Sequence, residues 1–209
     1  MKNTLTIAFI LMSITALAQS NNNSKKQVHF GVKVGGNYSN VYDSKGEEFK
    51  ADGKLGFAGG AFVHIPISSI IGIQPEVLFS QKGFKGTGRL LASNYEIKRT
   101  SNFIDVPLLL AISPTKNFTI VVGPQFSFLT KQKDEFTSGT INTLQEQEFK
   151  NDNLRKNILG IVGGVDFAAD KALISLRGGW DTQTNNGDGT SNTPRYKNAL
   201  LQATVGFRL

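Results

Sequence analysis

Apolar residues alternate with polar or small residues along eight separate stretches of the chain. The most regular stretch covers residues 199–209. Its apolar face consists of Ala199, Leu201, Ala203, Val205, Phe207 and Leu209. Successive side chains of a β-strand point to opposite sides, so strict alternation indicates a strand that lies between two different environments. The predicted strands are 28–41, 55–67, 71–83, 101–112, 118–129, 157–167, 172–182 and 199–209.

The connections between these strands alternate in length without a break. Long connections cover residues 43–54, 83–99, 131–156 and 183–197, and short ones cover 68–69, 113–117 and 168–171. An up-and-down barrel that crosses a membrane has tight turns at its periplasmic rim and long loops outside. Since a strand edge in hydrocarbon leaves backbone groups unpaired, the sheet must close. The pattern therefore predicts an all-β fold, an eight-stranded antiparallel up-and-down transmembrane β-barrel.

The N-terminal segment has the layout of a secretory signal peptide. Lys2 supplies a positive charge, residues 5–17 are mainly apolar, and Ala16-Leu17-Ala18 provides an A-x-A cleavage site. The apolar run is too short for a membrane-spanning helix. We expect a signal peptide at 1–18, a flexible lead-in at 19–27 and the barrel domain at 28–209. The chain has no cysteine, so disulfides cannot stabilise this domain.

Several short motifs resemble those of one family. GVKVGGNYSN, IQPEVLFSQKGFKG, IDVPLLLA and VVGPQFSFL occur in this order, followed by LLQATVGFRL. On these motifs the mature chain resembles the PorT-type outer-membrane β-barrel family. The resemblance implies a barrel in the outer membrane of a Gram-negative bacterium. One member's link to a protein secretion system implies envelope or secretion-system proteins as partners.

Charged residues of the predicted strands fall on the face opposite the apolar one. Eight strands leave an interior just wide enough for side chains, and a buried charge must be paired or hydrated. We expect Glu76, Asp105 and Asp166 to face Lys33, Arg177 and Arg208 in a network that plugs the lumen. The predicted inward position of Phe62 and Phe103 favours this plug over a narrow polar conduit.

Two further groups of residues are candidates for contacts with the membrane. The second long connection forms a predicted basic surface loop, which we expect to contact lipopolysaccharide phosphates. Its basic residues are Lys82, at the base, Lys85, Arg89, Lys98 and Arg99. A merely solvated loop is the alternative reading. Tyr38, Phe128 and Trp180 lie near the long-connection ends of their strands, where an aromatic belt is expected.

The sequence contains no recognisable cofactor, metal or nucleic-acid motif. Its glycine pairs lack the strand-to-helix turn of a nucleotide site. The segment DTQTNNGDGTSN lacks the sixth-position glycine and closing glutamate of a calcium loop. A basic patch at the cell surface meets lipid phosphates rather than nucleic acid. We therefore expect no cofactor, no metal ion and no nucleic-acid partner.

Three classes of function remain. The leading one is a non-enzymatic outer-membrane protein that serves surface interaction, envelope structure or secretion-related assembly through its long loops. A small lipid-modifying enzyme would need His29 or His64, and both lie toward the predicted periplasmic side. A soluble, lipocalin-like periplasmic barrel would have an apolar inner face. The alternating connections and the charged minor face favour the membrane protein.

Overall fold

The computed structural model describes residues 27–42, 50–90, 93–138, 141–148, 156–185 and 196–209. For residues 50, 88–90, 93–95 and 141–148 it describes the backbone alone. The predicted signal peptide and all of the predicted lead-in except Gln27 lie outside these ranges. Within them, no helix has the length and apolar character required to cross a membrane.

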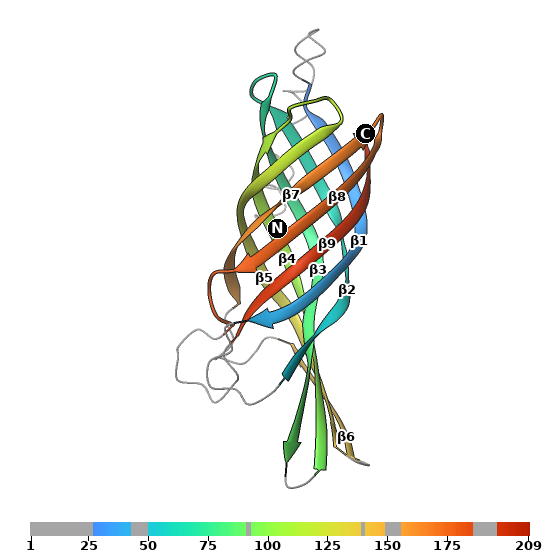
Figure 1. Ribbon diagram of the computed structural model, residues 1–209, viewed down its shortest axis with the longest axis vertical. Helices are drawn as coiled ribbons and strands as arrows, with labels where there is room; N and C mark the ends of the chain where they lie inside the picture. The colour runs from blue at the N-terminus through green and yellow to red at the C-terminus, as the bar shows by residue number, and fades with distance from the viewer. Residues whose placement is uncertain (1–26, 43–49, 91–92, 139–140, 149–155, 186–195) are drawn as a thin grey trace, which may run out of the picture.

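The described residues form a closed antiparallel β-barrel of eight strands, and a ninth strand lies outside the barrel wall (Figure 1). The strands are β1 (His29–Tyr42), β2 (Lys50–Pro66), β3 (Ile71–Leu90), β4 (Ser93–Ile112), β5 (Phe118–Ser138), β6 (Ile141–Glu148), β7 (Asn157–Ala169), β8 (Ala172–Asp181) and β9 (Lys197–Arg208). Neighbours pair in the order β1-β2-β3-β4-β5-β7-β8-β9, and β9 pairs with β1. The predicted fold class and its eight strands are confirmed.

The two faces of the wall have opposite chemistry. Val205 and Leu176 on the outer face are 58% and 46% exposed, whereas Arg177 and Glu76 on the inner face are 4% and 2% exposed. This is the reverse of a water-soluble barrel and is the pattern expected of a barrel whose outer face meets lipid. The alternation in the sequence therefore assigned inside and outside correctly.

The short turns and both described chain ends lie at one end of the barrel, at the top of Figure 1. The backbone N–H of Leu209 donates to the carbonyl of Phe30 at 2.9 Å, so the last strand ends beside the start of the first. The β7–β8 hairpin turns through Asp170, whose φ of 54° lies in the left-handed region. Aspartate tolerates this conformation better than most residues, because its short side chain can hydrogen-bond to the local backbone.

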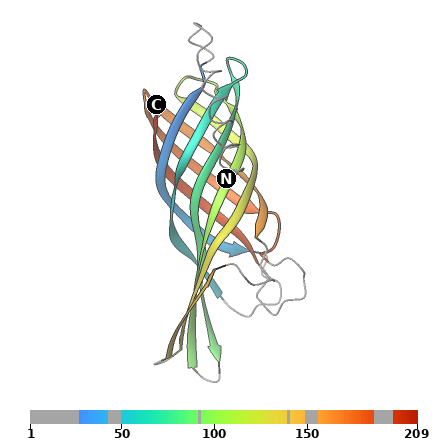
Figure 2. The same cartoon turned by 180° about the vertical axis from the view of Figure 1, so that it is seen from behind.

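At the opposite end, three strands continue far beyond the barrel wall, as the lower parts of Figures 1 and 2 show. The β3–β4 ladder runs without a break from Gly83↔Thr100 to Leu90↔Ser93. The expectation of a long loop at 83–99 is therefore wrong. Likewise β6, which pairs with the outer part of β5, forms inside the predicted connection 131–156. The name "extension" is used below for this projecting part, residues 81–90, 93–102 and 130–138 with β6.

The extension escaped prediction for a physical reason. Beyond the level of Phe84 and Arg99, its strands leave the barrel interior that buries these two side chains, so their sequence carries little apolar alternation. Once β3 and β4 are paired in the wall, each further residue pair adds backbone hydrogen bonds without a new loop-closure cost. The ladder therefore continues where the hydrophobic pattern stops.

Candidate functional site

Side chains on the inner face of the barrel lie in three successive tiers, which begin near the short turns. The first tier centres on Glu76 of β3. Its carboxylate accepts a hydrogen bond from the ammonium of Lys33 on β1 and lies 3.6 Å from Nη2 of Arg177 on β8. Nη2 of Arg177 also lies 2.7 Å from Oδ1 of Asp166 on β7. The Gln74 amide donates to both carboxylates, at 3.0 Å to Glu76 and 3.1 Å to Asp166.

The neighbouring strands leave room for these long side chains. Lys33 faces Gly60 across the β1–β2 ladder and Gly206 across the β1–β9 ladder. Gly164 faces Arg177 in the same way. A Cβ on Gly164 would lie 2.0 Å from the carbonyl oxygen of Leu176. Glycines at these positions therefore let the strands approach closely while a large charged residue fills the lumen between them.

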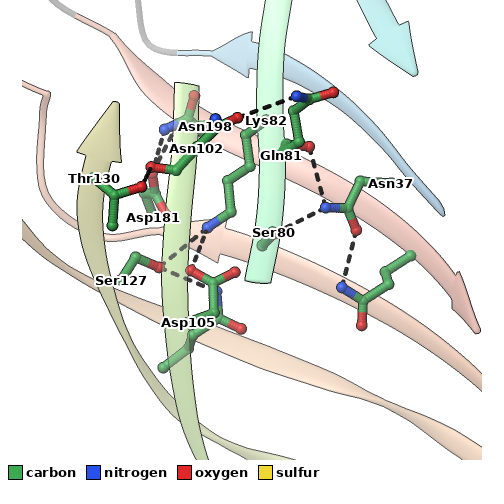
Figure 3. Close-up of polar contacts among 12 residues, drawn as sticks. Asn37, Ser80, Gln81, Lys82, Asn102, Asp105, Ser127, Thr130, Asp181 and Asn198 are labelled. Atoms are coloured by element: carbon green, nitrogen blue, oxygen red, sulfur yellow. Dashed lines mark hydrogen bonds and ion pairs between the residues drawn. The ribbon is translucent and has the colours of Figure 1, made fainter. Parts of the chain in front are cut away.

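The second tier surrounds Lys82, whose ammonium lies 3.1 Å from both Oδ1 of Asp105 and Oγ of Ser127 (Figure 3). The same ammonium lies 4.7 Å from the ring centroid of Phe103, close enough for a cation–π contact. Lys82 and Asp105 are each 1% exposed. Because both charges are buried, each depends on the other for compensation.

Neutral hydrogen bonds extend this tier across the barrel. Nδ2 of Asn37 on β1 donates to Oγ of Ser80 at 2.9 Å, and Gln202 on β9 donates to Oδ1 of Asn37 at the same distance (Figure 3). Farther along β9, the Asn198 amide donates to the carboxylate of Asp181 on β8 at 2.6 Å. Side chains from β1, β3, β4, β5, β8 and β9 thus contribute to one tier.

The third tier lies at the outer mouth and is built around Arg99. Its guanidinium makes a two-pronged contact with Asp134, with Nε and Nη2 at 2.8 and 2.7 Å from the two carboxylate oxygens. Nη1 donates to the hydroxyl of Tyr196 at 3.2 Å. The Tyr196 and Phe84 rings pack edge to face, 5.2 Å apart. Paired hydrogen bonds from a planar guanidinium hold this layer in one geometry.

The structure changes the membership of the predicted charge network. It brings Lys33, Glu76, Asp166 and Arg177 together in the first tier. Asp105 instead pairs with Lys82 in the second tier. Arg208 is half-buried at the short-turn rim and makes no ion pair within 4.0 Å to an acidic residue of the described ranges. These pairings depend on strand register and on the stagger around the barrel, which the sequence does not display.

The residues of the predicted basic surface loop do not all lie on the surface. Lys82 and Arg99 are 1% and 8% exposed and face the interior, so including them in a surface loop was wrong. Lys85 is exposed and Lys98 is partly exposed on the outer face of the extension. The side chain of Arg89 lies outside the described residues. The alternation itself held the missing signal, because Lys82 shares its strand face with Glu76 and Arg99 shares its face with Asp105.

The predicted aromatic belt residues lie on the outer face toward the end with the extension. Tyr38, Phe128 and Trp180 are 50%, 42% and 52% exposed. Their role at a membrane interface stays a prediction, for which these positions are suitable.

Both histidines lie at the short-turn end. His29 faces His64 across the β1–β2 ladder. Nδ1 of His64 lies 3.1 Å from Oε1 of Gln74, and no hydrogen bond within the described residues joins either imidazole to a serine. In the described ranges, no group of three or more potential metal ligands is close enough to hold an ion.

A family model described as "Outer membrane protein beta-barrel domain" matches residues 17–207. The chain belongs to this family. It is therefore an outer-membrane barrel of the Gram-negative type, and the soluble lipocalin-like alternative is excluded by this membership together with the apolar outer face. The match does not distinguish the PorT-type subgroup. No curated protein matched the chain.

Several solved outer-membrane structures are similar in fold. The attachment invasion locus protein Ail of Yersinia pestis is 14% identical, with 87% of this chain and 98% of Ail covered and a TM-score of 0.49. Neisserial surface protein A is 13% identical, with 86% and 97% covered and a TM-score of 0.48. The outer-membrane protease OmpT of Escherichia coli is 8% identical, with 92% and 100% covered and a TM-score of 0.39. At these identities the likeness says nothing about activity.

Proposed function

We propose that this outer-membrane barrel is a non-enzymatic protein whose lumen is plugged by its own side chains and whose extension serves surface interaction, envelope structure or secretion-related assembly. The observation that carries the plug is the stack of three tiers, in which Glu76, Lys82 and Arg99 each meet partners from other strands. A continuous conduit would need one unblocked path past all three levels.

Energetics support a closed lumen. Side chains of Lys33, Glu76, Lys82 and Asp105 are at most 1% exposed. Charges removed from water to this degree are tolerated when close partners and hydrogen bonds compensate them. Since the partners come from different strands, the network also ties opposite walls together. It therefore acts as internal support in a barrel whose described apolar core consists of small clusters.

Two placements support a non-enzymatic role. Chemistry on outer-leaflet lipids would need a catalytic base near the outer rim, but His29 and His64 lie at the periplasmic end. His64 contacts the Gln74 amide, which supplies no nucleophile. The extension, by contrast, projects a paired sheet away from the barrel (Figure 2). The resemblance to the PorT-type family favours envelope or secretion-system proteins as partners of this projecting sheet.

Thiol accessibility tests the plug, because the native chain contains no cysteine. Ser80→Cys places a thiol on a fully buried inner position, and Lys116→Cys places one in an exposed periplasmic turn as the matched control. In reconstituted vesicles we expect a water-soluble thiol reagent to label the Lys116→Cys variant rapidly and the Ser80→Cys variant hardly at all. Steady ion currents through the native protein in a planar bilayer, together with rapid labelling of the Ser80→Cys variant, would show a conduit instead.

A further inference from the structure

Four lysines gather on the outer face of the chain where the extension leaves the barrel: Lys54, Lys85, Lys98 and Lys133. Lys85 of β3 lies directly opposite Lys98 of β4 in the ladder. Lys133 of β5 lies opposite Thr100, and the Lys54 ammonium of β2 donates to the hydroxyl of that same threonine. The name "lysine cluster" is used below for these four residues.

Positive charge in the lysine cluster exceeds the nearby negative charge. Glu135 lies 3.3 Å from Lys98 and 2.9 Å from Lys133, and Asp52 of β2 lies opposite Lys85 in the β2–β3 ladder, so these two carboxylates stand beside four ammonium groups. Like charges directly opposite each other destabilise a β-ladder. The sheet thus maintains a repulsive arrangement that an external anion would relieve.

The position of the lysine cluster relative to the lipid band indicates which anion. Along the outer face, the exposed apolar residues of β2 and β3 end at Leu55 and Phe79 toward the extension. Gln81 follows, hydrogen-bonded to Asn102 of β4 at 3.1 Å (Figure 3). Lys54 directly adjoins Leu55. Lys85 pairs with Asp52, three residues beyond Leu55, which is about 10 Å along the strand and less in height because barrel strands tilt. This is the level of lipid headgroups, on the side of the sheet that faces them.

We propose that the lysine cluster binds phosphate groups of lipopolysaccharide in the outer leaflet. Each ammonium offers three hydrogen-bond donors to phosphate oxygens, and four ammonium groups from adjacent strands span more than one phosphate. The proposal deepens the surface role proposed above and rests on the extension lying outside the cell. It is independent of the plug, so the thiol and conductance experiments do not decide it.

The test uses the full-length protein, purified in detergent and mixed with lipid A that carries phosphates or has been dephosphorylated. The native protein is compared with the Lys54→Gln, Lys85→Gln, Lys98→Gln triple variant. A Lys116→Gln, Lys171→Gln variant is the charge control, because both residues are exposed at the periplasmic turns. A folded barrel migrates differently on a gel before and after heating. The temperature at which this change in mobility occurs verifies that all three proteins are folded barrels.

We expect phosphorylated lipid A to bind the native protein and the control variant alike, and the triple variant about a hundred-fold more weakly, since each lysine near an anionic surface contributes about five-fold. Dephosphorylated lipid A should bind the native protein and the triple variant with the same affinity. Equal affinity of the native protein and the folded triple variant would overturn the proposal. So would equally tight binding of phosphatidylglycerol vesicles, which would show general attraction to anionic lipid.

Discussion

Glu76 compensates more buried positive charge than any other carboxylate in the first tier, because both Lys33 and Arg177 depend on it. Replacing Glu76 with alanine leaves the ammonium of Lys33 buried without its ion-pair partner, while Arg177 retains Asp166. We expect Glu76→Ala to lower the free energy of unfolding by about 3–5 kcal/mol, the usual effect of breaking a buried ion pair from one side. Urea titration of the protein folded into lipid vesicles measures this change.

A paired substitution separates loss of charge balance from loss of packing. Lys33→Met with Glu76→Leu removes one charge of each sign and retains similar volume. We expect this double variant to be closer to the native stability than Glu76→Ala is, because it removes the cation together with its partner and Arg177 retains Asp166. A double variant less stable than Glu76→Ala would show that the network stabilises through geometry rather than compensation.

Two adjacent glycines of β7 differ sharply in the space around them. A Cβ on Gly164 would lie 2.0 Å from the Leu176 carbonyl oxygen, whereas the nearest heavy atom to a Cβ on Gly163 would be 3.5 Å away. We expect Gly164→Ala to destabilise the barrel by about 1–3 kcal/mol, as overpacking against backbone does. Gly163→Ala should be close to neutral. The same urea titration distinguishes them, and equal losses would contradict the close strand approach.

At the scale of elements, the extension shows how strands remain paired after leaving lipid. Its register is specified by continuation from the wall and by ion pairs across β4 and β5, including Lys98 with Glu135 and Arg99 with Asp134. The Lys98–Glu135 pair and similar partly exposed pairs contribute little individually. Their effect is expected on local opening of the extension rather than on global unfolding.

Glu135 gives this local effect a pH dependence. Hydrogen bonds from Lys133, and then from Lys98, lower the pKa of its carboxyl below the ordinary 4.5. The ionised Glu135 carboxylate therefore stabilises the extension above about pH 4.5, and this stabilisation is lost as the pH falls through the lowered pKa. Near neutral pH we expect Glu135→Gln to increase amide hydrogen exchange in the extension, relative to native. Well below pH 4.5 the two proteins should exchange alike; a difference that persists there would contradict the assignment.

At the scale of the whole molecule, the outer surface must match a membrane that is apolar at its centre and polar at its edges. Leu176 lies midway along β8, while Leu55 lies at the rim beside Lys54. We expect Leu176→Arg to destabilise the folded barrel by about 2–4 kcal/mol and Leu55→Arg by about 0–1 kcal/mol, following the depth dependence of lipid-facing charges. Equal effects at both sites in vesicle titrations would contradict this placement of the lipid band.

Much of the molecule was predictable from particular residues. Strict alternation at Val205 and Phe207 identified a lipid-facing side, and Glu76 and Arg177 identified the lumen. These predictions succeed because one strand has only two faces, and each face meets a single kind of solvent. The candidate site was less predictable: Lys82, at the end of the predicted strand 71–83, and Arg99, in the predicted connection 83–99, were grouped in a basic surface loop, although both are buried.

The sequence alone determined the fold class, the eight wall strands and the face of wall residues such as Val205 and Glu76, because these depend on period-two patterning and on the local choice between turn and strand. The tertiary structure decided which charges meet. Lys33 reaches Glu76 and Lys82 reaches Asp105 only after closure and stagger bring separate strands to one level. The same is true of the lysine cluster, whose members come from four strands and become neighbours through register alone.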